Sequence, residues 1–210
     1  MRSMRTVKYN PQYCTGILKC EIEEISDSIQ ARYILSVKLN HDNNRTIAFI
    51  LMNPSKATTA TSDMTVNKVI KFAYSEGYGK ALFFNLFPFY ETHSNGLSNI
   101  FTAISSLDNH DLDKIFEKNL NHIKLYMSKA DKVVFGWGDP SKNISESLHN
   151  KLTQSIIDHC KKMNITPYVF KTHYQSLLTL KGSPRHPIRP RLEGIVPFRV
   201  SGTEERHFLR

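Results

Sequence analysis

The sequence is poor in cysteine and lacks paired metal-ligand motifs. Three cysteines, Cys14, Cys20 and Cys160, occur among 210 residues, and none of them stands in CxxC spacing. An odd and unpaired set is typical of free thiols, and it argues against a disulfide framework, a zinc site or an iron–sulfur cluster. We therefore expect no metal.

Long apolar runs are absent as well. No stretch approaches the roughly 20 apolar residues that a membrane-spanning helix needs. The N-terminus is basic, but the apolar segment of a signal peptide does not follow it. These absences predict a cytoplasmic protein without a membrane partner.

Several motifs of nucleotide-binding and hydrolytic enzymes are missing. GxxxxGK[ST] does not occur, and "GWGDPS" from Gly136 lacks the third glycine of a dinucleotide-binding motif. Neither HExxH nor GxSxG is present. The sequence therefore disfavours nucleoside triphosphatases, zinc hydrolases and serine hydrolases, and we expect no cofactor.

Acidic residues are the minority among the charged ones. There are 28 Lys and Arg against 19 Asp and Glu, which gives a formal charge of +9 and a pI near 9.4. An excess of this size favours a polyanionic partner, and DNA is the partner that we expect. The alternative is a basic surface without a specific partner.

The length and the 40% of apolar residues suit one α/β domain that spans residues 1–210. We expect residues 1–10 to form a loose basic arm and residues 181–210 to form a basic, loop-rich tail. Nothing in the sequence calls for a second copy, so a monomer is expected.

The apolar pattern predicts alternating strands and helices. "ARYILSVKLN", "HDNN" and "RTIAFILMN" indicate a strand, a turn and a second strand. A helix follows, which Asp63 or Thr65 can cap, and Ala81–Phe89 is the next buried strand. Further helices are expected at 111–128 and 144–163, and further strands at 132–138 and in "TPYVF". The sequence thus predicts a three-layer αβα domain with a mostly parallel central sheet.

Polar or glycine-rich residues end three of the predicted buried strands. Asn53 stands before Pro54 and Ser55, Asn85 lies within "FFNLFPF", and "GWGDP" begins at Gly136. Parallel strands share one carboxyl edge, which is where ligands bind in such sheets. Asn53 can also be an ordinary turn residue. Asn85 is costly to bury unless it is hydrogen-bonded, and an amide tip matches the edge of a nucleobase.

Other candidate residues have two interpretations each. His186 lies between Arg185 and Pro187, where it is either a solvated residue or a contact to phosphate or sugar. Asp63 is either a helix cap or a catalytic group. Several aromatic residues are either core residues or platforms on which a base stacks, namely Phe72, Phe87, Phe89, Tyr90 and Trp137.

Four motifs together resemble a bacterial and phage family described as a domain of unknown function. They are "ILMNPSKAT", "SDMTVNKVIKFAYSEGYGKALFFNLFPF", "KVVFGWG" and "GSPRHP", which extend from Ala48 to Pro187. The chain departs from the family at Lys68, where an Arg is usual. This change keeps the charge but loses the planar fork of a guanidinium.

The order of the short motifs also resembles the uracil-DNA glycosylase superfamily. That resemblance implies that Asn53 positions a water molecule, that Asn85 reads the base, and that a late loop around His186 presses into DNA. The late loop departs from the superfamily, because "SPRHP" replaces a His-Pro-Ser order.

The resemblance implies a monofunctional DNA glycosylase that removes a flipped-out, modified pyrimidine and acts in phage defence. Asn53, His186 and Asp63 would be catalytic. The base would contact Asn85, Ser55, Phe72, Phe87, Phe89 and Trp137. The DNA backbone would contact Arg185, Arg189, Arg191 and Lys56. Two alternatives remain open, namely a non-catalytic nucleic-acid-binding module and a nucleoside enzyme with a carboxylate nucleophile such as Asp63 or Asp139.

Overall fold

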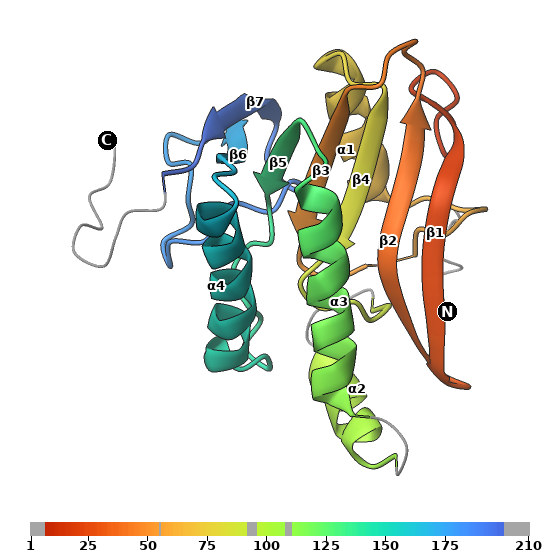
Figure 1. The fold of residues 1–210 in the computed structure, drawn as a ribbon, viewed down its shortest axis with the longest axis vertical. Helices are drawn as coiled ribbons and strands as arrows, with labels where there is room; N and C mark the ends of the chain where they lie inside the picture. Colours follow the sequence, from red (N-terminus) through yellow and green to blue (C-terminus); the bar gives the residue numbers. More distant parts are fainter. Residues whose placement is uncertain (1–6, 55, 92–95, 108–110, 200–210) are drawn as a thin grey trace.

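A seven-stranded mixed sheet forms the centre of the protein in the computed structural model, which describes residues 7–54, 56–91, 96–107 and 111–199 (Figure 1). The strands lie side by side in the order β1-β2-β4-β3-β5-β6-β7. In chain order they are β1 (Cys14–Ser26), β2 (Ile29–Leu39), β3 (Thr46–Leu51), β4 (Lys80–Asn85), β5 (Lys132–Phe135), β6 (Pro167–Thr172) and β7 (Leu192–Pro197).

Only the middle of the sheet is parallel. Strands β4, β3, β5 and β6 run in one direction, whereas β1, β2 and β7 pair antiparallel with their neighbours. The prediction of a mostly parallel sheet is therefore correct for the four central strands and wrong for the flanks. An apolar run shows that both faces of a strand are covered, but it does not show the direction of the strand.

The first predicted pair of strands is not a hairpin. β2 and β3 follow one another in the chain, yet β4 lies between them in the sheet. β1 was not predicted, because it lies at the edge of the sheet and its buried and exposed residues do not alternate regularly. Its pairing with β2 contains several register shifts, which blur the period of two that identifies a strand.

Four helices in the described residues cover the two faces of the sheet. They are α1 (Met64–Ser75), α2 (Leu97–Ser105), α3 (Leu112–Met127) and α4 (Glu146–Lys162). α1 contributes to one hydrophobic core, and α2, α3 and α4 contribute to the other. In Figure 1, α3 crosses in front of the sheet and α1 lies behind it. The helices predicted at 111–128 and 144–163 are confirmed as α3 and α4, whereas α2 was not predicted.

Helix α1 forms where the sequence pattern indicates it. Val66, Val69, Ile70 and Ala73 repeat at helical spacing, and all four are buried against the sheet. Burial of an aliphatic side chain such as Ile70 contributes roughly 1.5–3 kcal/mol, so this stripe holds the helix in place. Gly77 follows with φ +76°, a backbone conformation that favours glycine and ends the helix.

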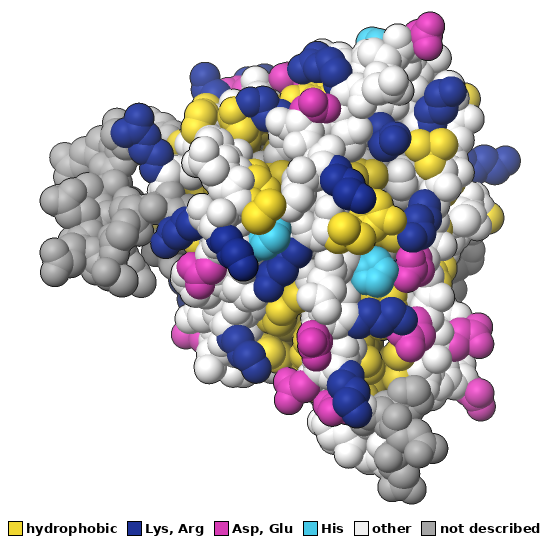
Figure 2. Space-filling view, viewed as in Figure 1, with side chains coloured by type: hydrophobic (Ala, Val, Ile, Leu, Met, Phe, Trp, Pro, Cys, Tyr) yellow, Lys and Arg dark blue, Asp and Glu magenta, His cyan; other side chains and the backbone are white. Residues whose placement is uncertain are grey.

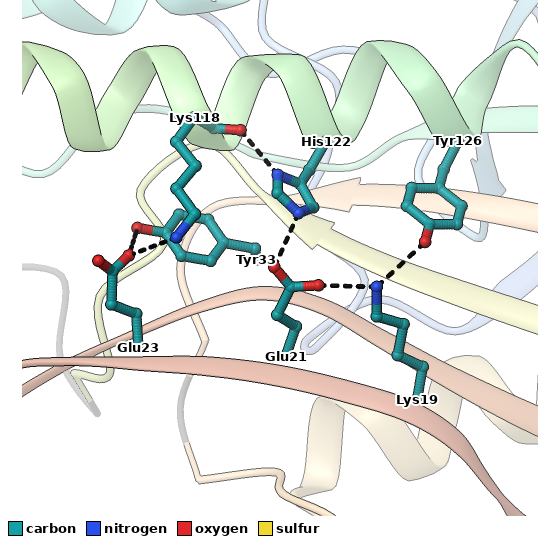
Figure 3. A network of polar contacts seen from close by, with 7 residues as sticks. All are labelled: Lys19, Glu21, Glu23, Tyr33, Lys118, His122 and Tyr126. Atoms are coloured by element: carbon teal, nitrogen blue, oxygen red, sulfur yellow. Dashed lines mark hydrogen bonds and ion pairs between the residues drawn. The ribbon is translucent and has the colours of Figure 1, made fainter.

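Polar contacts fasten the long edge strand β1 to α3 (Figure 3). Glu21 accepts hydrogen bonds from Lys19 Nζ at 2.7 Å and from His122 Nε2 at 2.9 Å, and Lys118 Nζ lies 2.9 Å from Glu23 Oε2. The bond from Lys19, together with the nearby His122, holds the pKa of Glu21 below its usual value. These side chains are partly solvated, so each pair stabilises the fold only weakly.

Both ends of the chain contain ordered contacts. The described part of the N-terminal arm pairs with the loop after β3, where Ser62 N donates to the Val7 carbonyl at 2.7 Å. Tyr9 Oη donates to the Thr58 carbonyl at 2.6 Å. In the predicted C-terminal tail, residues 192–197 form β7. Residues 1–6 and 200–210, which the predicted arm and tail include, lie outside the described residues.

Candidate functional site

The carboxyl ends of the central strands define one edge of the sheet. β3 connects through α1 to β4 on one side, and the chain later enters β5 on the other side of β3. The strand order therefore reverses between β3 and β5. Ligands of open α/β sheets bind beyond the carboxyl ends of the strands at such a reversal. In Figure 1, β3 and β4 point downward, toward this edge.

Asn53 lies two residues beyond β3, where it holds two loops together. Its Nδ2 donates to the Glu91 carbonyl at 2.5 Å and to the Pro54 carbonyl at 3.2 Å. The Glu91 backbone N–H returns a bond to the Pro54 carbonyl at 3.0 Å. These bonds fix the amide orientation, and no described residue donates a hydrogen bond to Oδ1. This acceptor is therefore available to a water molecule.

Asn85 is the last residue of β4, in register with Leu51 on β3. Only 1% of its surface is exposed. Its Oδ1 accepts a bond from Arg32 Nη2 at 2.8 Å, but its Nδ2 donates to no described residue. In the described residues, Asn85 Nδ2 is not one of the fully buried polar atoms that lack a partner, so this donor can be reached by water or a ligand.

Asn53 and Asn85 thus lie beyond or at the carboxyl ends of two neighbouring parallel strands. Backbone bonds continue past the ends of those strands, from Leu86 N to the Leu51 carbonyl and from Phe87 N to the Met52 carbonyl, both at 2.9 Å. The structure therefore brings the two amides to one edge of the sheet.

Arg32 is a residue of this edge that the sequence reasoning missed. Its guanidinium is 2% exposed, and besides Asn85 it donates through Nη1 to the Ala57 carbonyl at 2.9 Å. Tyr90 Oη donates to the same carbonyl at 2.9 Å. No Asp or Glu of the described residues forms an ion pair with Arg32. The signal was present in the sequence, since a single Arg interrupts the apolar strand that contains "ARYILSV".

The loop that carries His186 docks on the end of β5. Gly138 N donates to the Pro184 carbonyl at 2.9 Å, and a Cβ at Gly138 would lie 3.2 Å from His186 Cβ. Lys68, on α1, donates to the Ile188 carbonyl at 3.0 Å and to the Pro190 carbonyl at 2.6 Å. Lys68 therefore anchors this loop.

His186 is held in its neutral form. Burial, with the cations Lys68 and Arg189 nearby, lowers the pKa of His186 from 6.5 to about 4. Ile188 N lies 3.4 Å from Nδ1, so Nδ1 is the acceptor and Nε2 carries the proton. No described residue contacts Nε2 through a hydrogen bond, so this N–H is a donor that is available to a ligand.

The aromatic candidates are core residues. Phe87 and Phe89 are fully buried and pack against Phe101 and Phe116, edge-on in every pair except the tilted pair of Phe87 and Phe101. Phe72 and Trp137, which are 9% and 3% exposed, pack against the core residues Phe170 and Phe135. None of these four rings presents an open face, because the sheet and its covering helices enclose them. These contacts favour the interpretation of the four rings as core residues over the interpretation as base-stacking platforms.

The basic candidates differ in their surroundings. Arg185 Nε donates to the Ser176 carbonyl at 2.8 Å, and Arg191 forms an exposed ion pair with Glu193 at 2.7 Å. Arg189 and Lys56 are exposed, while Ser55 lies outside the described residues. On the face that Figure 2 shows, Lys and Arg are interspersed with Asp and Glu. This face is not uniformly basic.

Asp63 caps helix α1. Its Oδ1 accepts a bond from Val66 N at 2.8 Å, and its backbone is extended, as at a helix N-cap. A carboxylate in this role is fixed by the helix that it caps. The structure therefore supports the interpretation of Asp63 as a helix cap and gives no contact that would make it a catalytic group.

A rigid turn with an exposed leucine lies beside the end of β5, and the sequence reasoning missed it. Thr179 Oγ1 donates to Asp139 Oδ1 at 2.6 Å, and Ser183 N donates to Thr179 Oγ1 at 3.1 Å. Gly182 closes the turn with φ +82°. Leu180 is fully exposed at its tip. It is one of several large apolar side chains that are exposed in the described residues.

Two other kinds of site were searched for in the described ranges. Within these residues, no cluster of three or more His, Cys, Asp or Glu side chains is arranged to hold a metal ion. None of the described helices combines the length and the apolar character that crossing a bilayer requires.

The fold and the site define a mixed α/β protein whose carboxyl sheet edge carries two amides, an imidazole and a buried guanidinium. A family described as "Protein of unknown function (DUF1643)" matches residues 32–188. The chain belongs to this family, and the match begins at Arg32 and includes Asn53, Asn85 and His186. No curated protein and no solved structure matches the chain.

The cap at Asp63 predicts how its variants behave. Asp63→Ala removes the bond to Val66 N and should lower the free energy of unfolding by about 1 kcal/mol. Asp63→Asn should be nearly neutral, because asparagine caps as well as aspartate. Urea unfolding measures both variants. Equal destabilisation by Asn and Ala would contradict the assignment as a cap.

The lowered pKa of His186 predicts a dependence of stability on pH. The unfolded chain binds a proton near pH 6.5, whereas folded His186 binds one only near pH 4. The stabilisation that neutral His186 contributes is therefore complete above pH 6.5, and it declines as the pH falls from 6.5 to about 4. Urea unfolding should show this slope in the wild type and a shallower one in His186→Gln. An NMR titration of the ring that gave a pKa near 6.5 would contradict the prediction.

Proposed function

We propose that the protein is a monofunctional DNA N-glycosylase that removes a flipped-out base, a modified pyrimidine, and leaves an abasic site. The observation that carries this proposal is the meeting of Asn53 and Asn85 at one sheet edge, each with one polar atom that no described residue bonds. The acceptor on Asn53 and the donor on Asn85 suit a water molecule and a base, respectively.

The chemistry of base removal fits a site without a dedicated carboxylate. As the N-glycosidic bond breaks, positive charge develops on the sugar and negative charge on the departing base. Asn53 Oδ1 orients water toward the sugar, and Asn85 Nδ2 donates to the base. His186 Nε2–H, on the neighbouring loop, is a second donor for the developing anion. A neutral imidazole suits this role because it donates a hydrogen bond without adding a charge that depends on pH.

The fold is consistent with this proposal without deciding it. Helix α1 packs on one face of the sheet and α2, α3 and α4 pack on the other, an arrangement compatible with the αβα layering that the resemblance to uracil-DNA glycosylases implies. The basic composition suits a DNA partner, and Arg189 is exposed beside the His186 loop. A role in phage defence, as a monomer in the cytoplasm, follows from the same resemblance.

The braced turn at Leu180 adds a candidate for opening the duplex. Proteins that bend or open DNA insert apolar side chains between base steps. Leu180 is fully exposed, and its turn is bonded to Asp139, four residues beyond the end of β5. We propose that Leu180 enters the stack while the target base leaves it.

The two alternative functions fit the geometry less well. A nucleoside enzyme that uses a carboxylate nucleophile would need Asp63 or Asp139. Asp63 caps α1, and Asp139 accepts a hydrogen bond from Thr179. A non-catalytic binding module would need neither the free acceptor of Asn53 nor the buried donor of Asn85. The formation of abasic sites separates both alternatives from the proposal.

The role of Asn53 gives the first functional prediction. Asn53→Ala should reduce the formation of abasic sites by at least a hundredfold, because no side chain then orients the water. Labelled DNA that carries uracil or phage-type modified pyrimidines is incubated with the protein and cleaved with alkali. Asn44→Ala, which replaces an exposed residue at the opposite edge of the sheet, is the control. Full activity of Asn53→Ala would remove this residue from the mechanism, and intact strands with wild-type protein on every substrate would refute the glycosylase.

The role of Leu180 gives a second prediction. Leu180→Ala should lower the cleavage rate on fully paired duplex by about tenfold or more, since opening a paired stack costs a few kcal/mol. The same variant should be close to wild type on single-stranded DNA, where no stack needs opening. Leu125→Ala, at a leucine that is 53% exposed on α3, is the matched control. An equal loss on both substrates would show that Leu180 does not act by opening the duplex.

A further inference from the structure

Arg32 and Asn85 form a pair of unusual composition. Both side chains are almost fully buried, and Arg32 Nη2 donates to Asn85 Oδ1 at 2.8 Å. The guanidinium has no acidic partner among the described residues. Buried charges are normally paired, because an isolated charge loses its hydration. A cation in this position therefore needs another explanation.

The pair fixes which atom of Asn85 faces Arg32. A guanidinium has only donors and never loses its proton under ordinary conditions, so the amide must turn its oxygen toward it. Asn85 is then left with Nδ2, a group that can only donate. A free asparagine could turn either its donor or its acceptor toward a ligand, but the bond from Arg32 holds Oδ1 on its own side and leaves Nδ2 for the ligand.

Direct anion binding by Arg32 does not fit its contacts. Nη1 is bonded to the Ala57 carbonyl and Nη2 to Asn85, and Nε is buried without a partner. A phosphate or carboxylate is recognised by a guanidinium through two parallel N–H groups. Each terminal nitrogen donates one N–H to a protein atom, and burial leaves the remaining N–H groups little room for a ligand, so the charge of Arg32 acts on a ligand through Asn85.

We infer that Arg32 is a positioning residue that makes Asn85 a one-sided, polarised donor, so that the site selects a base with an exocyclic oxygen over its amino counterpart. An amino group would face Nδ2 with donor against donor, and one of the two would stay unpaired. The inference rests on the proposed function and names the chemical class of base that this function acts on.

The charge of Arg32 also affects the departing base. A hydrogen bond from a cation to Oδ1 withdraws electron density from the amide, and this strengthens the Nδ2–H donor. The benefit grows as negative charge develops on the base oxygen. Loss of the guanidinium should therefore slow the removal of poor leaving groups more than the removal of good ones.

The first test measures binding without turnover. Protein labelled with ¹⁵N is titrated with free uracil, cytosine, hypoxanthine and adenine, and the side-chain amide signal of Asn85 is followed by NMR. The signal is assigned by its loss in Asn85→Ala. Uracil and hypoxanthine should shift it at concentrations about tenfold lower than cytosine and adenine, because an unpaired buried donor costs at least that much affinity. Equal responses to the members of each pair would overturn the inference.

The second test compares variants of Arg32. In Arg32→Gln, the amide of Asn85 is no longer locked, and the preference for the oxygen-bearing bases should fall to about twofold or less. Arg32→Lys keeps a donor-only cation and should keep most of the preference. If Arg32→Gln does not fold, Arg32→Lys alone tests the inference, and a loss of the preference in this variant would contradict it. Arg45→Gln removes the same charge at the amino edge of the sheet and should change nothing. A preference that survives in folded Arg32→Gln would overturn the inference.

The third test uses DNA that carries 5-fluorouracil, uracil or thymine, which are progressively poorer leaving groups. The loss of rate in Arg32→Gln should increase along this series and should be small in Arg32→Lys, whereas a purely structural defect would lower all three rates alike. If wild-type protein shifts the Asn85 signal with uracil but leaves every DNA intact, the proposed function fails and the inference survives. If wild-type protein forms abasic sites but its Asn85 signal responds equally to all bases, the inference fails and the proposed function survives.

Discussion

The buried guanidinium of Arg32 is the interaction on which the carboxyl edge depends. It donates to the Ala57 carbonyl, in the loop after β3, and to Asn85, at the end of β4. One side chain on β2 thus joins two segments that are separate in the chain. Because the described residues offer it no carboxylate, only dipoles and the nearby Tyr90 ring balance its charge. A site built this way is stable only while every dipole stays in place, so the loop after β3 cannot move independently of Asn85.

The sheet explains why these groups meet. The parallel strands β4, β3 and β5 carry apolar side chains on both faces, and the two cores that they form leave only their ends for polar groups. Asn85 and the residues that follow β3 and β5 therefore collect at one edge, where α1 contributes Lys68 from the side. The glycine at position 138 lets the His186 loop approach the backbone closely. Packing and function occupy different parts of the same strands, which lets the edge carry strained or unpaired groups without loss of the core.

Sequence patterns predicted the central strands, α1, α3 and α4, because these elements have clear periods and clear caps. They could not give the strand order, the antiparallel flanks or α2, since strand direction and neighbours depend on contacts that are distant in the chain. Asn53, Asn85 and His186 could be chosen as candidates because each is a polar residue that lies in an apolar stretch or next to a proline. The roles of the aromatic candidates could not be assigned from the sequence, because a phenylalanine that packs in a core and one that stacks on a base have the same local sequence. Leu180 was missed because a sequence does not show exposure, whereas Arg32 was missed although it interrupts an apolar strand.

A site of neutral amides and a neutral imidazole has a consequence for catalysis. Base removal creates opposite charges on sugar and base, and a carboxylate in the site would stabilise the first but repel the second. In the proposed reaction the neutral groups would orient water and donate to the base, while the buried cation Arg32 lies behind Asn85. This placement favours departure of the base as an anion and does not require its protonation. The low pKa of His186 agrees with that arrangement, because a proton held at Nδ1 would break the bond from Ile188 N, whereas Nε2 carries its proton in the neutral ring.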